Sequence, residues 1–174
     1  MTHIEHKLKA PTKIRFAIII VSDSRYTQQK RGVKVEDESS PIAKRAIEEK
    51  GYEVSNEEIV PDESEMITKT ILRSVEKNNL DAIITIGGTG ISKRDVTTDS
   101  VEKLLTKEIP GFGEMFRSIS FQRIGTAAIL SRALAGIIGG KPIFCLPGSP
   151  QSIEVGLKEL ILPEIGHMLK HIRE

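Results

Sequence analysis

The sequence predicts a three-layer α/β/α sandwich built on a mostly parallel sheet. Short runs of aliphatic, often β-branched residues alternate along the chain with segments that repeat apolar residues at helical spacing. The strand-like runs are apolar at nearly every position, which is typical of parallel strands covered by helices on both faces. A length of 174 residues suits one domain. We place that domain at residues 14–174 and expect residues 1–13, which are polar and aperiodic, to form a flexible arm.

Composition and charge exclude several classes of protein. The chain carries 25 basic and 24 acidic residues, so its formal net charge of +1 gives no broad field to hold a nucleic acid or an anionic membrane. The longest apolar run near the start, residues 16–21, is far shorter than the roughly 18 residues of a transmembrane helix. Residues 1–13 lack the apolar core of a signal peptide. We therefore expect a cytoplasmic globular protein that binds neither nucleic acid nor membrane.

The first elements of the domain are a strand, a loop and a helix. Residues 14–21 form a continuous apolar run and should be a central strand that ends in polar residues. Residues 25–37 have no apolar period and are predicted to form a long mobile loop, of the kind that acts as a lid near a site. Ser40 before Pro41 places a capping hydroxyl ahead of a first-turn proline, which predicts a helix that Gly51 ends.

The remaining elements continue the alternation of strand and helix. Residues 52–60, 80–86 and 142–146 predict three further strands, and a helix at 62–78 separates the first two. Apolar residues at helical spacing predict the other helices: one from near Thr98, one at 112–120, one at 127–138, and one from residue 150 to the C-terminus, in which Pro163 starts or kinks the final part.

Three polar loops follow predicted strands, at residues 22–24, 87–98 and 147–152. In an open α/β sheet, ligands bind outside the carboxyl ends of the strands, because loops and helix N-termini meet there. The three loops therefore predict one composite pocket.

The loop at 87–90 reads Gly-Gly-Thr-Gly and is the most informative of the three. Glycines let backbone N–H groups approach a phosphate, although a tight exit from the strand explains them equally simply. The pattern is neither the dinucleotide fingerprint nor the P-loop. Lys93 and Arg94 can meet phosphate oxygens in such a loop, or they are solvated surface charges.

Two aspartates are candidates for a metal site. Asp95 can hold Mg²⁺ or can simply form a turn. Asp62 stands where the N-cap of a helix belongs, with Glu65 as a capping-box partner. It also follows a predicted strand, where its carboxylate can share a metal with Asp95, and the two roles are compatible.

Other polar residues have good structural explanations. Ser149 as an N-cap and Pro150 in a first turn explain the third loop, although the same geometry is an anion site. Asp99 and Glu102 complement a helix dipole. Cys145, the only cysteine, is better interpreted as a small buried side chain than as a nucleophile.

At GGTGISKRDVTTDS, PGFGEMFRSISFQRIGTAAILSRALAG and LPGSPQSIEVGL the chain resembles the MoaB/MogA family of molybdenum cofactor biosynthesis, over residues 14–162. The resemblance implies that family's three-layer α/β fold, a homo-trimer or hexamer, and work on molybdopterin. MogA-like members use Mg-ATP to adenylylate the terminal phosphate of molybdopterin and release pyrophosphate. It also implies contact with a MoeA-type metal insertase.

The resemblance further implies roles for individual residues. Asp62 and Asp95 match family acids that handle Mg-ATP, and they are the implied catalytic and Mg²⁺-binding residues. Nucleotide-binding residues are implied in the glycine loop, to which we add two from the first polar loop: Gly87, Gly88, Thr89, Gly90, Ser22 and Asp23. The residues that match the molybdopterin side are Ser118, Ser131, Arg132, Gly148 and Ser149.

Two features bear on activity. The segment around 116–136 is more similar to MoaB than to MogA, and some MoaB proteins have lost the loop aspartate, whereas Asp95 is present here. Thr98 stands where the family commonly has proline, which alters the entry into the helix more than the chemistry. We expect an active MoaB-type adenylyltransferase for molybdenum or tungsten cofactor. The alternatives are a non-catalytic molybdopterin carrier and a nucleotide hydrolase of the competence-damage type.

Overall fold

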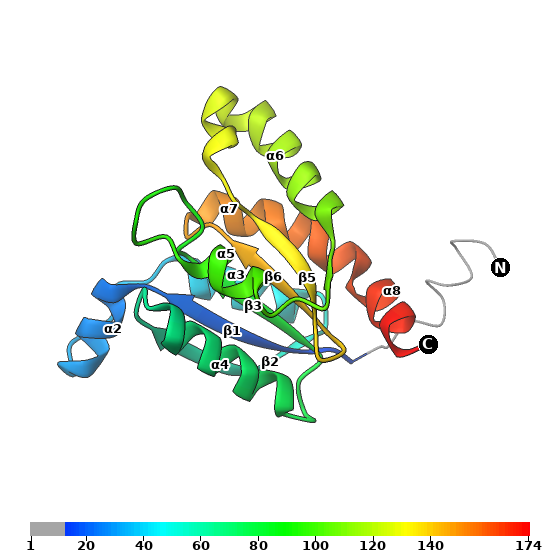
Figure 1. The fold of residues 1–174 in the computed structure, drawn as a ribbon, viewed down its shortest axis with the longest axis horizontal. Coiled ribbons are helices and arrows are strands. Elements are labelled where there is room, and N and C mark those ends of the chain that lie inside the picture. The colour runs from blue at the N-terminus through cyan, green and yellow to red at the C-terminus, as the bar shows by residue number, and fades with distance from the viewer. Residues whose placement is uncertain (1–12) are drawn as a thin grey trace.

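The protein is a three-layer α/β/α sandwich around one six-stranded sheet (Figure 1). A computed structural model describes residues 13–174, so the arm predicted at residues 1–13 lies outside the described residues except for Lys13. The strand order is β2-β1-β3-β6-β5-β4. The strands are β1 (Arg15–Val21), β2 (Glu53–Val60), β3 (Ala82–Ile86), β4 (Lys107–Glu108), β5 (Leu134–Ile138) and β6 (Lys141–Leu146).

Four neighbouring strands, β2, β1, β3 and β6, are parallel, whereas β5 and β4 pair antiparallel at one edge. The prediction of a mostly parallel sheet is therefore confirmed. The side chains of β1 alternate between the two cores, because successive residues of a strand point to opposite faces. Phe16 and Ile18 pack in one core, and Ala17 and Ile19 pack in the other.

Helices cover both faces of the sheet. One core contains residues of α3 (Ser39–Glu49), the first half of α6 (Pro110–Ile124), α7 (Pro150–Glu154), a π-helical segment η2 (Val155–Ile161) and α8 (Leu162–Arg173). The other core contains residues of α4 (Ser64–Glu76) and α5 (Thr97–Glu102). Across residues 13–174 no helix combines the length and the apolar content that a membrane crossing requires.

The helix predicted at residues 127–138 is wrong. A 3₁₀ segment, η1 (Gly125–Leu130), follows α6, and the apolar run after it is strand β5. Gly139 and Gly140, with φ of 54° and 76°, form a two-residue hairpin turn that returns the chain into β6. A short apolar run fits a buried strand as well as a helix, and the Gly-Gly pair was the signal that decides between them.

The loop predicted at residues 25–37 is partly wrong, because α2 (Asp23–Lys30) occupies its first half. No residue of α2 is buried, so no apolar period marks this helix in the sequence. The start predicted for the next helix is also shifted. Glu38, not Ser40, occupies the N-cap position of α3 and makes no side-chain capping bond. The carboxylate of the preceding residue, Asp37, accepts hydrogen bonds from the backbone N–H groups of Ser39 and Ser40 at 3.0 and 3.3 Å.

Several local predictions are confirmed. Ser149 caps α7, its hydroxyl accepting from the Ser152 N–H at 3.2 Å, and Pro150 stands in the first turn. Pro163 lies in the first turn of α8. Cys145 is fully buried in β6, and burial raises the pKa of its thiol to about 12.

Candidate functional site

The carboxyl ends of the parallel strands bring the three predicted polar loops together. The Gly87 N–H donates to the Leu146 carbonyl at 2.9 Å, which ties the exit of β3 to the exit of β6. The Ser22 N–H donates to the Val60 carbonyl at 2.9 Å, which ties the exit of β1 to the exit of β2. A Cβ on Gly148 would lie 3.7 Å from the Gly87 Cα, so the third loop runs directly beside the glycine loop.

The glycine loop folds tightly against its neighbours. Gly87 and Gly88 have φ of 104° and 65°, a conformation that favours glycine. A Cβ at Gly87 would overlap the Val21 carbonyl, and one at Gly88 would overlap the Thr97 hydroxyl. Part of the glycine requirement is therefore structural, as a tight strand exit predicts. The same lack of side chains leaves the backbone open to a ligand.

Asp95 is held by the loop that contains it. Its Oδ2 accepts from the Ser92 N–H at 2.8 Å, and a Cβ on Gly90 would lie only 2.8 Å from the same oxygen. Partial burial alone would raise the pKa of Asp95, but the hydrogen bonds from Ser92 and Gly90 and the charge of Arg132 outweigh it and lower the pKa. Asp95 is thus a fixed, ionised carboxylate at neutral pH.

Asp62 is not the N-cap of α4. Glu63 occupies that position and makes no side-chain capping bond. The Asp62 carboxylate instead accepts from the Asp23 N–H at 2.9 Å, and the Asp23 carboxylate accepts from the Asp62 N–H at 3.0 Å. Burial and the nearby charge of Asp95 raise the pKa of Asp62. The two carboxylates are therefore close enough to repel each other, and a cation between them would relieve that repulsion.

Thr97 supplies an unpaired hydroxyl beside this acidic pair. Its side chain is buried, and within residues 13–174 its Oγ1 has no hydrogen-bond partner. A Cβ added to Gly88 would overlap the Thr97 Oγ1 and would lie 3.3 Å from the Asp62 Oδ1. The Thr97 hydroxyl and the Asp62 carboxylate therefore border the same small space beside Gly88. Buried polar groups are nearly always satisfied, so the unpaired Thr97 hydroxyl is available to an ion or water that completes the site.

These groups fit Mg²⁺ only together with a substrate. No cluster of three or more histidine, cysteine, aspartate or glutamate side chains that could hold a metal occurs within residues 13–174. Mg²⁺ is commonly bound through one or two carboxylates and completes its shell with water and substrate phosphates. Asp62 and Asp95 match that donor set.

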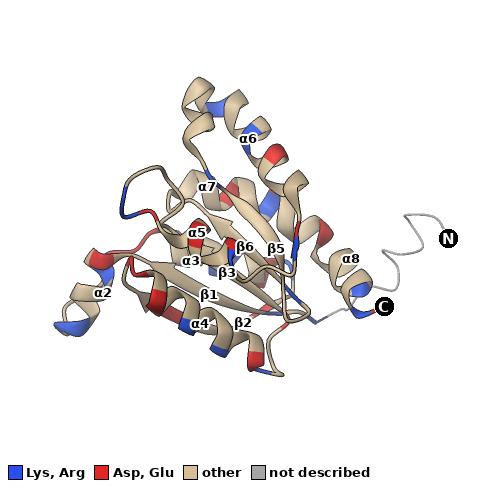
Figure 2. Ribbon diagram, in the orientation of Figure 1, with Lys and Arg blue, Asp and Glu red and all other residues tan. Residues whose placement is uncertain are grey.

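The basic residues of the loop do not all face this site. Arg94 forms an ion pair with Asp23 at the start of α2, and Lys93 is exposed. Figure 2 shows acidic and basic positions meeting where α2 begins near the loop that precedes α5. Ser22 caps α2. Asp23 lies next to the acidic pair, because it exchanges two hydrogen bonds with Asp62, and Ser22 precedes it in the chain.

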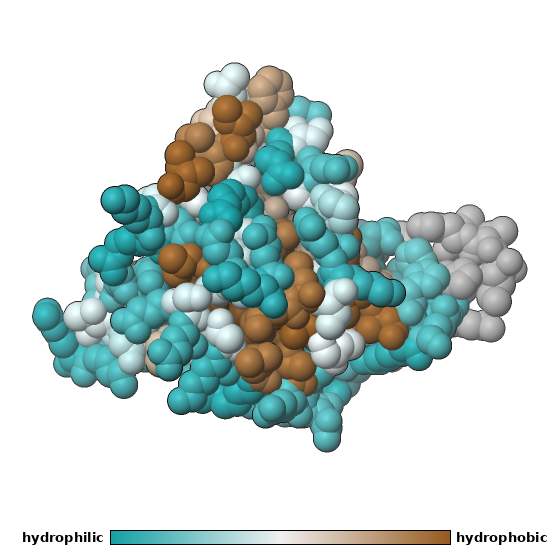
Figure 3. Space-filling view, viewed as in Figure 1, coloured by the Kyte–Doolittle hydropathy of each residue, from teal (hydrophilic) through white to brown (hydrophobic). Residues whose placement is uncertain are grey.

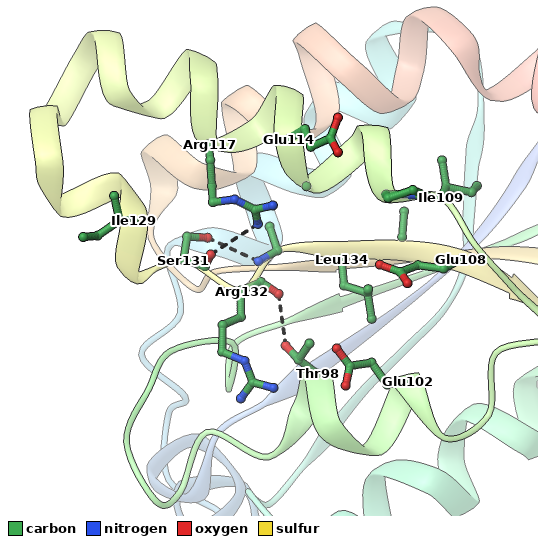
Figure 4. A pocket seen from close by; sticks show the side chains of 14 residues that line it. Thr98, Glu102, Glu108, Ile109, Glu114, Arg117, Ile129, Ser131, Arg132 and Leu134 are labelled. Carbon is green, nitrogen blue, oxygen red and sulfur yellow. Dashed lines mark hydrogen bonds between the residues drawn. The ribbon is translucent and has the colours of Figure 1, made fainter.

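A cavity of about 350 Å³ lies between α5, α6 and the start of β5 (Figure 4). Arg117 extends from α6 toward the Ser131 carbonyl, with its Nη1 3.5 Å from that oxygen. Arg132 lines the cavity on the side of α5. Glu102 and Glu108 also line it, so it offers guanidinium groups for an anion and carboxylates for hydrogen-bond donors.

The residues predicted for molybdopterin fall in three places. Ser131 and Arg132 line the cavity. Ser149 lines a second, smaller cavity of about 40 Å³, and Gly148 lies beside the glycine loop. Ser118 is exposed on α6 and is not among the lining residues of either cavity.

Sequence reasoning missed two residues that the structure brings to the site. Thr97 gave no signal, because an isolated threonine at a helix start has many explanations. Arg117 lines the cavity with Gly113, four residues before it on α6. A glycine and an arginine at that spacing share a helix face, which was the available signal.

Comparison with known proteins identifies the family of this chain. The family described as "probable molybdopterin binding domain" matches residues 17–167. The chain is 43% identical over 169 residues to "Molybdenum cofactor biosynthesis protein B" of Bacillus cereus, covering 97% of this chain and 96% of the relative. It is 40% identical to "Probable molybdopterin adenylyltransferase" of Methanocaldococcus jannaschii, covering 92% and 95% of the two chains.

Solved structures agree with both the fold and the family. The crystal structure of the "tungsten cofactor synthesizing protein MoaB from Pyrococcus furiosus" superposes with a TM-score of 0.82 at 38% identity, covering 95% of this chain and all of that one. The family match and the near-complete coverage of these relatives show that this chain belongs to the molybdopterin-binding domain family of molybdenum cofactor biosynthesis proteins.

Proposed function

We propose that this protein is a molybdopterin adenylyltransferase of molybdenum or tungsten cofactor biosynthesis. In the proposed reaction it transfers adenylate from Mg-ATP to the terminal phosphate of molybdopterin. One observation carries the proposal: a pair of acids beside a glycine loop adjoins a cavity lined by two arginines, and Arg132 links the two. The name of the M. jannaschii relative supports the same reaction.

The nucleotide binds at the acidic pair in this proposal. Backbone N–H groups of Gly88 and Thr89 contact the ATP phosphates, with Ser22 and Asp23 at the neighbouring edge. Gly87 and Gly90, whose N–H groups are bonded to the Leu146 carbonyl and the Asp95 carboxylate, contribute a backbone without side chains that the phosphates can approach closely. Asp62 and Asp95 would hold Mg²⁺, which would neutralise charge on the phosphates. The Ser92 and Asp23 N–H groups fix the two carboxylates, so they need no rearrangement to receive a metal.

Molybdopterin occupies the cavity side of the site. We propose that Ser131 and Arg132 contact it there, and that Gly148 and Ser149 of the third loop contact it beside the glycine loop. Ser118 lines neither cavity, so we leave it out of the proposed molybdopterin contacts. A phosphate oxygen of molybdopterin attacks the α-phosphorus of ATP. A new P–O bond forms, the bond from the α-phosphorus to the bridging oxygen breaks, and pyrophosphate leaves with that electron pair.

No protein nucleophile is needed for this step. The attacking phosphate is already ionised at neutral pH, so positioning and electrostatic stabilisation supply the rate enhancement. Cys145 cannot serve, because it is buried in β6 and its thiol stays protonated.

The test is a reaction with each component omitted in turn. The proposal predicts pyrophosphate and adenylylated molybdopterin only when ATP, Mg²⁺ and molybdopterin are all present. Pyrophosphate, phosphate or AMP formed without molybdopterin would indicate a nucleotide hydrolase. Tight molybdopterin binding without any product would indicate a carrier.

We also propose that the protein is a cytoplasmic homo-oligomer, a trimer or hexamer, that passes its product to a MoeA-type metal insertase. The surface of α6 and η1 supports self-association. Exposed apolar side chains gather on the end of α6 and on η1, the part of this region that projects from the sheet (Figures 1 and 3): Phe121, Ile124, Ile129 and Leu130. We call these four residues the α6–η1 patch. A patch of this kind typically marks a protein interface.

A further inference from the structure

Asp99 holds the side chain of Arg132 through both of its oxygens. The Arg132 Nη1 donates to Oδ2 at 3.0 Å, and Nη2 donates to Oδ1 at 2.6 Å. Two parallel hydrogen bonds fix the plane of a guanidinium as well as its position. The two residues are 33 positions apart, Asp99 in the first turn of α5 and Arg132 just before β5.

The backbone of Arg132 is fixed from the same direction. Its N–H donates to the Thr89 carbonyl at 3.0 Å, and its carbonyl accepts from the Thr98 hydroxyl at 3.2 Å (Figure 4). Arg132 is thus attached at three points to the glycine loop and α5, the elements that carry the proposed nucleotide site.

Arg132 faces both halves of the site. Arg132 lines the 350 Å³ cavity, and its charge is close enough to Asp95 to lower the pKa of that carboxyl. A guanidinium has five N–H donors, and Asp99 uses only two, so three remain for an anion. The pairing with Asp99 also leaves Arg132 ionised, since the carboxylate raises the pKa of the guanidinium further.

We propose that Asp99 is a positioning residue that orients Arg132 at the junction of the acidic pair and the cavity, where Arg132 binds the phosphate of molybdopterin. The inference rests on the proposed function, because the anion it names is the proposed acceptor substrate. It assigns Asp99 a role beyond complementing the dipole of α5. An acid that only complemented the dipole would need no bidentate contact with a residue outside its own helix.

The test compares Asp99→Asn with two further variants. Asp99→Glu keeps the charge and offers both oxygens again, so it should restore part of the function. Glu65→Gln is the matched control, because Glu65 is also an exposed acid in the first turn of a helix and lies outside the site. Thermal unfolding of each variant monitors the fold.

Asp99→Asn should raise the KM for molybdopterin about tenfold. Removing a residue that orients a ligand-binding side chain typically lowers affinity or activity by at least about that factor. The KM for ATP and the melting temperature should change little, and Glu65→Gln should resemble wild type in all three. A lower KM for molybdopterin in Asp99→Asn would show that Asp99 competes with the ligand for Arg132. An unchanged KM would leave Asp99 only its helix-dipole role. Either result overturns the proposal.

A second measurement is independent of turnover. In the free protein, the ¹⁵Nε–Hε order parameter of Arg132 should be high in wild type and Asp99→Glu and clearly lower in Asp99→Asn. An order parameter unchanged by Asp99→Asn overturns the positioning role even if the wild type proves inactive. Inactivity of the wild type with molybdopterin, accompanied by the expected loss of order, rejects the proposed function and leaves the orienting contact intact.

Discussion

Asp62 and Asp95 are held in different ways, and this difference defines their proposed roles. Asp95 receives backbone hydrogen bonds and faces Arg132, which lower its pKa, whereas burial and the charge of Asp95 raise the pKa of Asp62. Asp95 is therefore the better permanent ligand for a divalent cation. A bound cation would stabilise the ionised form of Asp62 more, because burial and the charge of Asp95 disfavour that form in the free protein.

Replacing Asp95 by Asn should separate activity from stability. The amide oxygen still accepts a backbone hydrogen bond, but the charge that we propose holds Mg²⁺ is lost. Turnover should fall on the order of a hundredfold or more, because a preorganised charge contact to the transition state is removed. The free energy of unfolding should change by about 1 kcal/mol at most.

Formation of adenylylated molybdopterin and thermal unfolding, measured on the same preparations, check this prediction. Glu63→Gln is the control, since it removes an exposed acid next to Asp62 that makes no capping bond. Near wild-type turnover in Asp95→Asn would reduce Asp95 to a turn residue. Unfolding of the variant would show that its role is structural.

The sequence located the main groups of this site but not their arrangement. Asp95 and the glycines were recognisable because both stand in a polar loop after a buried strand. The pairing of Arg132 with Asp99 joins residues 33 positions apart, so only the fold reveals it. Thr97 was recognised only from the structure, because its buried hydroxyl has no hydrogen-bond partner within the described residues.

At the scale of elements, strands that are buried on both faces were the most predictable part of the fold. β1, β3 and β6 are long apolar runs that no surface helix would show. α2 and β5 were missed for opposite reasons. No residue of α2 is buried, so its sequence shows no apolar period. The apolar run of β5 also fits part of a buried helix, so its sequence does not distinguish the two.

Asp81 ties the last helix to the amino end of the sheet. It accepts from the backbone N–H and the Nε of Arg15 at 2.9 and 3.1 Å, and from the Nη2 of Arg173 of α8 at 2.6 Å. Burial by itself raises the pKa of Asp81, but the bonds from Arg15 and Arg173 outweigh burial and lower it. Asp81→Asn should therefore reduce the free energy of unfolding by about 1–3 kcal/mol near neutral pH.

The effect of Asp81 should depend on pH in one direction. Because its pKa is lower in the folded than in the unfolded chain, its stabilisation is complete above the unfolded value of 3.8 and is lost as the pH falls through the folded value. Urea unfolding from about pH 6 to about pH 3 should show wild type and Asp81→Asn converging.

Glu154→Gln is the control for this series. It breaks a half-exposed ion pair with Lys158, so it should cost about 0.5 kcal/mol or less. A constant difference between wild type and Asp81→Asn across the pH range would contradict the assignment of the stabilisation to the ionised carboxylate.

At the scale of the whole molecule, the α6–η1 patch predicts self-association. Ile129 is 74% exposed and Phe121 is 54% exposed, so a monomer would leave large apolar side chains in water. Sedimentation should show a trimer or hexamer at micromolar concentration. Ile129→Glu should shift the distribution toward the monomer, because burying an unpaired charge at an interface is costly.

Leu72→Glu, on α4 and 42% exposed, is the matched control and should leave the assembly unchanged. A wild-type monomer at micromolar concentration would contradict the prediction. So would an assembly that Ile129→Glu leaves intact.

We propose that the acidic pair and the glycine loop bind Mg-ATP next to the arginine-lined cavity. A crystal structure with Mg²⁺ and a non-hydrolysable ATP analogue would locate both ligands. We expect phosphates on the backbone of Gly87–Gly90, a metal contacting Asp62 and Asp95, and the α-phosphate toward Arg132. A nucleotide bound elsewhere, or a metal that touches neither aspartate, would contradict it.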